Sequence, residues 1–154
     1  MPERTHVVDG FRLGWLPPGL GTSVSDFTYE WDDVSFTSRV WETGSDDAGW
    51  RVDMQVTVMR GDVLSDPAAM HAYLARYHER DPETWARTPF DHLGDPGFRA
   101  ETALFWLAEP GVAVWVHLDG ERFSDQQLVR TACGVTGTTS GIATTSGTAT
   151  SGTG

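Results

Sequence analysis

The sequence predicts an α+β domain: an antiparallel sheet of about six strands in the order β-β-β-β-α-β-β-α, with two helices packed on one face. Alternating apolar and polar residues joined by short turns indicate antiparallel strands. Two further segments repeat apolar residues every three or four positions after a helix-capping residue, which predicts helices. Residues 136–154 are almost entirely Thr, Gly, Ser and Ala. We therefore expect a folded domain at 1–135 and a flexible tail at 136–154.

The first three strands are expected before residue 42. Residues 7–16 form the first strand, and the Pro-Pro-Gly sequence at 17–19 ends it. Alternation then predicts strands at 27–31 and 34–41, and two aspartates between them are typical of a hairpin turn.

Residues 50–58 show the clearest alternation in the chain. The apolar set is Trp50, Val52, Met54, Val56 and Val58, and the polar set is Arg51, Asp53, Gln55 and Thr57. This pattern predicts a half-buried antiparallel strand whose polar face is exposed. A glycine- and aspartate-rich turn at 44–49 leads into it.

The first helix is expected to begin after Asp66, because an acidic N-cap precedes a proline at the first helical position. Its apolar positions are Met70, Tyr73, Leu74 and Tyr77. The helix should end near Arg80, and residues 82–96 are expected to form a loop that folds onto the core.

The remaining elements are two strands and a helix. Strands at 98–108 and 111–118 are joined by a tight Glu-Pro-Gly turn. Ser124 and Gln127 have the spacing of a capping box, and Gly134 is a typical helix stop. The second helix should therefore lie between these signals.

The charge excludes several classes of function. The chain has 22 acidic and 11 basic residues, a net charge of −11, and no Lys or Asn. Such acidity disfavours binding to nucleic acid or anionic lipid. The replacement of every Lys by Arg is typical of a GC-rich bacterial genome. No signal peptide or membrane-spanning segment is recognisable, so a cytoplasmic location without membrane insertion is expected.

No known catalytic or metal-binding motif is present, so the sequence predicts no catalytic residue, no metal site and no cofactor. His71 and His78 are separated by about 10.5 Å of helical rise, too far to share one zinc ion. The pairs Asp91-His92 and His117-Asp119 leave open an enzyme that uses His92 or His117 with a neighbouring carboxylate. Cys133 is the only cysteine and is expected to pack in the core.

Aromatic residues point to a binding function. The chain has seven Trp, seven Phe and three Tyr, more than a small core requires. The residues predicted to line a ligand-binding groove on the sheet are Trp41, Trp106, Trp115, His117 and Arg39. The alternative is that the 82–96 loop covers these rings as ordinary core.

The leading hypothesis is a non-enzymatic module that binds a protein segment or a small apolar ligand. A structural accessory domain that forms a homodimer through an exposed sheet edge is a further interpretation.

Two segments resemble a known family. They are Leu16-Pro17-Pro18-Gly19-Leu20 and the stretch 97–132, which contains Phe105-Trp106, Trp115-Val116 and the Leu118-Asp119-Gly120 turn before the last helix. Together they are similar to a domain of unknown function found in extracytoplasmic parts of bacterial anti-sigma factors and related lipoproteins. The resemblance implies an α+β fold and a sensing or protein-binding role without a cofactor. The family's membrane anchor and sigma-binding helix are not recognisable in this sequence.

Overall fold

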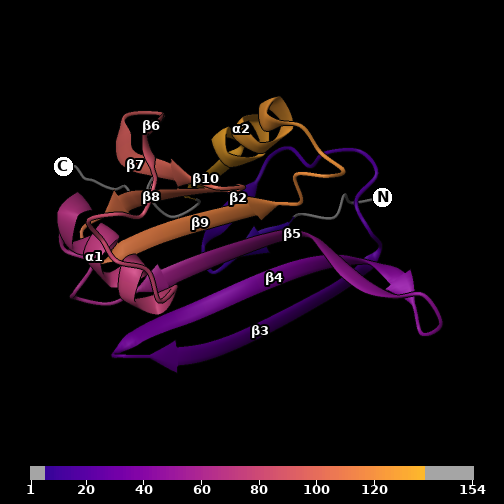
Figure 1. Ribbon diagram of the computed structural model, residues 1–154, viewed down its shortest axis with the longest axis horizontal. Helices are drawn as coiled ribbons and strands as arrows, with labels where there is room; N and C mark the ends of the chain where they lie inside the picture. The colour runs from indigo at the N-terminus through magenta and orange to yellow at the C-terminus, as the bar shows by residue number, and fades with distance from the viewer. Residues whose placement is uncertain (1–5, 138–154) are drawn as a thin grey trace, which may run out of the picture.

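The computed structural model describes residues 6–137 (Figure 1). Its elements are β1 (Val7–Val8), β2 (Phe11–Leu13), β3 (Ser23–Trp31), β4 (Val34–Ser45), β5 (Gly49–Arg60), α1 (Pro67–Tyr77), β6 (Thr88–His92), β7 (Asp95–Ala100), β8 (Ala103–Glu109), β9 (Val112–Leu118), α2 (Asp125–Cys133) and β10 (Val135–Gly137). The α+β class is confirmed, because two helices accompany antiparallel strands. No helix among the described residues combines the length and the apolar character needed to cross a lipid bilayer.

The strands form two sheets. Seven strands make one antiparallel sheet in the order β3-β4-β5-β9-β8-β7-β6, and β1, β2 and β10 make a small second sheet. Strand β10 pairs with β2, with Val135 opposite Leu13. Thr136 and Gly137 therefore belong to a strand, two residues beyond the expected domain boundary. The rest of the expected tail, 138–154, lies outside the described residues.

The two helices pack on opposite faces of the large sheet, which differs from the expected placement on one face. Leu104 and Trp106 of β8 belong to the buried cluster that contains Leu128 of α2. The intervening Phe105 belongs to a second cluster, which contains Leu74 of α1. Because all residues from Ala103 to Leu107 are buried, β8 needs cover on both faces. We call these faces the α2 face and the α1 face.

Strand β5 shows the same two-sided burial at its centre. Val58 belongs to the cluster on the α2 face and Met59 to the cluster on the α1 face. Asp53 and Thr57, expected on an exposed polar face, are fully buried. At the beginning of the strand, Trp50 and Val52 are 51% and 37% exposed. They lie where the β4–β5 hairpin projects from the rest of the sheet (Figure 1), so the expected half-buried pattern for 50–58 is wrong at these positions.

Two predicted segments have a different local structure. Residues 7–16 form a hairpin instead of one strand, because Asp9 and Gly10 have φ values of 45° and 87° and so reverse the chain. The expected 82–96 loop contains β6 and the beginning of β7. Strand β6 contains Pro89 and lies at the edge of the sheet, where a missing N–H is tolerated.

Candidate functional site

The five residues predicted to line one groove are divided between the two faces of the sheet. Trp41 and Trp106 are 3% and 1% exposed and belong to the cluster on the α2 face. Trp115 packs against the cluster on the α1 face, and His117 lies two positions further along the same strand. Arg39 forms an ion pair with a β3 aspartate, with 2.7 Å between Nε and Oδ1. One continuous aromatic groove is therefore not formed.

Trp41 is buried in a cluster to which the small sheet contributes. Its cluster includes Val8 and Phe11 of that sheet. Trp115 is half-buried, and its ring contacts His78 with 4.9 Å between centroids. Trp106 lines a cavity between the two sheets, which is the candidate site.

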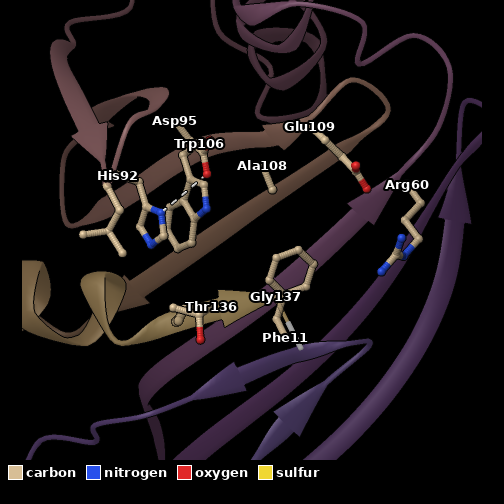
Figure 2. Close-up of a pocket in the computed structure, with 11 residues that line it drawn as sticks. Phe11, Arg60, His92, Asp95, Trp106, Ala108, Glu109, Thr136 and Gly137 are labelled. Carbon is tan, nitrogen blue, oxygen red and sulfur yellow. Dashed lines mark ion pairs between the residues drawn. The ribbon is translucent and has the colours of Figure 1, made fainter. Parts of the chain in front are cut away.

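This cavity lies between the α2 face of the large sheet and the small sheet, and we call it the inter-sheet cavity (Figure 2). Its volume is about 470 Å³, within the range of small-molecule sites. Apolar lining comes from Phe11, Trp106, Ala108 and Val135. Four strands of the large sheet each contribute one titratable side chain to the lining, and these residues are Arg60, His92, Asp95 and Glu109.

His92 is the most constrained polar group in this lining. The residue is 4% exposed, and its ring stacks on Trp106 with 3.9 Å between centroids and 4° between planes. Its Nε2 lies 2.8 Å from the carbonyl oxygen of Ala132. Because a carbonyl can only accept, Nε2 carries the hydrogen. When the ring is neutral, Nδ1 is therefore an acceptor.

The Nδ1 atom of His92 is buried and has no hydrogen-bond partner within residues 6–137. The nearest acidic group is the Asp95 carboxylate, with 3.9 Å between Nδ1 and Oδ2, marked by the dashed line in Figure 2. A neutral imidazole and a carboxylate both offer lone pairs here. The pair therefore favours a third group that donates hydrogen bonds or carries positive charge.

Arg60 and Glu109 lie at the other end of the inter-sheet cavity (Figure 2). The Arg60 guanidinium is held by Asp9, with Nε donating to Oδ2 at 2.7 Å and Nη2 to the backbone oxygen at 2.8 Å. Arg60 thus fixes the β1–β2 turn over the cavity. Among the ion pairs of the described residues, none involves Glu109, so its carboxylate is available to a ligand.

In the two His–Asp pairs considered for an enzyme, each aspartate has a hydrogen-bond partner other than the histidine. Asp91 accepts a hydrogen bond from a turn amide, and the carboxylate near His92 is that of Asp95. Asp119 accepts a hydrogen bond from an arginine of β5 at 2.7 Å. Burial lowers the pKa of His117, against the opposing effect of Asp119. Residues 6–137 contain no cluster of three or more potential metal ligands.

Asp95 and Phe11 were not identified as site residues from the sequence. His92 and Asp95 are opposite each other across a two-residue turn, in which Leu93 and Gly94 have positive φ. The Leu-Gly pair was the only local signal for this arrangement. Phe11 joins the cavity through pairing of distant strands, for which the local pattern gives no indication.

Comparison of the chain with protein-family models, with curated proteins and with solved structures finds no match. The resemblance to the domain of anti-sigma factors and lipoproteins therefore rests on the sequence motifs alone.

Proposed function

We propose that this domain is a non-enzymatic binding module whose inter-sheet cavity holds a small ligand with an apolar body and an ammonium or other hydrogen-bond-donating group. The observation that carries this proposal is the buried His92 ring, whose Nε2 is occupied and whose Nδ1 has no partner beside the Asp95 carboxylate. A buried polar atom without a partner is costly, so a ligand that supplies a donor is stabilised there.

The remaining lining fits the same ligand class. Carboxylates of Asp95 and Glu109 at the two ends can each pair with a cation, and hydrogen bonds to a charged group are stronger than neutral ones. Phe11 and Trp106 offer ring faces for the apolar body or for an ammonium group. The net charge of −11 also attracts cations to the molecule.

Calorimetric titration with an arylalkylamine tests the proposal, with phenethylamine as the probe and phenylpropionic acid as its acidic counterpart. We expect the amine to bind and to change Trp fluorescence, because Trp106 lines the cavity, whereas the acid does not bind. Asp95→Asn should weaken amine binding about tenfold, the loss of roughly 1.4 kcal/mol expected for one charged contact. Glu109→Gln, at the other end of the cavity, should weaken it by a smaller factor.

Asp62→Asn is the matched control, because this acidic residue is not part of the cavity lining, and it should leave amine affinity unchanged. Equal binding of the amine and the acid, or full amine affinity in both cavity variants, would contradict the proposed ligand class.

A further inference from the structure

A second, smaller cavity lies on the α1 face of the large sheet, on the opposite side from the inter-sheet cavity. Its volume is about 180 Å³, room for a ligand of a few non-hydrogen atoms given roughly 30 Å³ for each water in the liquid. We call it the His78 cavity. The lining residues used below are His78, Arg80, Trp85, Glu101, Trp115 and His117.

Aromatic rings pack closely around this cavity. His78 meets Trp115 edge to face, and Trp85 lies 5.6 Å from His78 and 5.9 Å from Phe105 between ring centroids. These contacts join the residues after α1 to strands β8 and β9. Aromatic rings therefore form one part of the wall, and polar side chains form the rest, namely His78, Arg80, Glu101, Thr102 and His117.

Three lining residues carry a buried ring nitrogen without a hydrogen-bond partner within the described part of the chain. These atoms are Nε2 of His78, Nε1 of Trp85 and Nε1 of Trp115. An indole nitrogen can only donate a hydrogen bond. The two indole nitrogens therefore require a hydrogen-bond acceptor. In the inter-sheet cavity, in contrast, His92 Nδ1 and the Asp95 carboxylate require a donor.

The charges around the cavity come from several elements. Arg80, which follows α1, forms an ion pair with Glu101, which follows β7. Asp119, beyond β9, acts on His117 but pairs with an arginine of β5. Burial lowers the pKa of His78, an effect that Arg80 adds to and Glu101 opposes, and burial likewise lowers the pKa of His117.

We propose that the His78 cavity binds a small carboxylate of about the size of acetate. Its two oxygens accept hydrogen bonds from the indole and imidazole donors, and Arg80 supplies the positive charge. Protonation of a neighbouring histidine adds a further donor and a further positive charge, so binding strengthens as the pH falls. The overall charge of −11 opposes an anion, and the expected dissociation constant is therefore in the millimolar range.

Two-dimensional NMR of the indole N–H groups tests this proposal directly. Trp85→Phe and Trp115→Phe variants assign the two signals. Addition of sodium acetate at pH 6 should move both signals in a saturable way, and binding should be several-fold weaker at pH 8. Sodium chloride at the same ionic strength should not move them, and acetamide, a neutral compound of the same shape, should bind at least tenfold more weakly.

Arg80→Gln should weaken acetate binding about tenfold. Arg87→Gln is the matched control, because Arg87 is nearby in the chain but does not line the cavity, and it should bind acetate like the unmodified protein. Overturning results would be indole signals that do not respond to acetate, that respond equally to chloride, or that respond equally to acetamide. None of these measurements depends on the inter-sheet cavity.

Discussion

Asp53 shows how one buried residue connects distant segments of the chain. Its carboxylate is fully buried and accepts hydrogen bonds from Arg122, from the Thr43 hydroxyl at 2.5 Å and from the Gly21 amide at 2.7 Å. Burial alone would raise the pKa of Asp53, but these hydrogen bonds together hold it below the usual value. The ionised carboxylate thus fastens the loop before β3 and the loop before α2 to strand β5.

Replacement Asp53→Asn should lower the free energy of unfolding at pH 7 by about 3 kcal/mol, because it leaves Arg122 without its buried partner. Since folding lowers the pKa of Asp53, its contribution is complete above the ordinary value near 3.8 and is lost as the pH falls through the folded value. Urea unfolding followed by Trp fluorescence measures both effects, and the variant should lose less stability than the unmodified protein below pH 4.

Asp26→Asn is the control for this measurement, because it removes the exposed ion pair with Arg39. Its cost should stay below about 1 kcal/mol. Equal costs for the two variants would mean that the Asp53 network does not join these segments as described.

At the scale of the element, helix α2 begins with signals that are entirely local. The Ser124 hydroxyl accepts from the Gln127 amide at 3.1 Å, and the Gln127 side chain accepts from the Ser124 amide at 2.9 Å. The helix then places Leu128 and Ala132 in the core of the α2 face. This capping box was predicted from the sequence, and the structure confirms it.

Ser124→Ala should destabilise the domain by about 1 kcal/mol, because two amides at the helix start lose their partners or their fixed geometry. Ser124→Asp keeps an acceptor at the same place and should recover most of this loss. The urea concentration at the midpoint of unfolding, measured for all three proteins, tests this prediction. An alanine variant as stable as the unmodified protein would show that the capping box does not stabilise the domain.

The local features of the fold could be predicted from the sequence. The segments that pack on each face of the large sheet could not. Caps and hairpin turns such as that at Asp32 and Asp33 depend on neighbouring residues. Trp41 shares its strand face with Arg39, and Trp115 shares its strand face with His117. Yet Trp41 is buried in a cluster that includes residues of the small sheet, whereas Trp115 contacts the end of α1. Those covers come from segments far away in the chain, so alternation alone could not separate the two tryptophans.

Contacts between distant segments also explain why the candidate site was not predicted from the sequence. Trp106 was selected for its ring, but its contact with His92 depends on the register of β6, β7 and β8. That register was not predicted, because residues 82–96 were expected to form a loop.

At the scale of the whole molecule, three histidines on the α1 face are expected to make the folded domain less stable at acid pH. Burial lowers the pKa of His71, of His78 and of His117. The unfolded chain therefore binds protons more readily than the folded domain in this range. By linkage, stability is complete above the ordinary histidine pKa near 6.5 and declines as the pH falls below it.

We expect the free energy of unfolding to decrease between pH 7.5 and pH 5.5, with a slope of at most about 1.4 kcal/mol per pH unit for each histidine. Most carboxylates titrate well below this window and contribute little to the change. Urea unfolding at the two pH values and constant ionic strength measures it. A variant carrying His71→Gln, His78→Gln and His117→Gln should show a flatter dependence, and an equally stable unmodified protein at both pH values would contradict the assignment.

The pairing of β2 with β10 brings residues 11–13 against residues 135–137. During synthesis, the N-terminal hairpin has no β10 partner until almost the whole domain has left the ribosome. Such long-range closure is slow compared with local folding. Among the described residues, the last strand to emerge is also the one that completes a wall of the inter-sheet cavity.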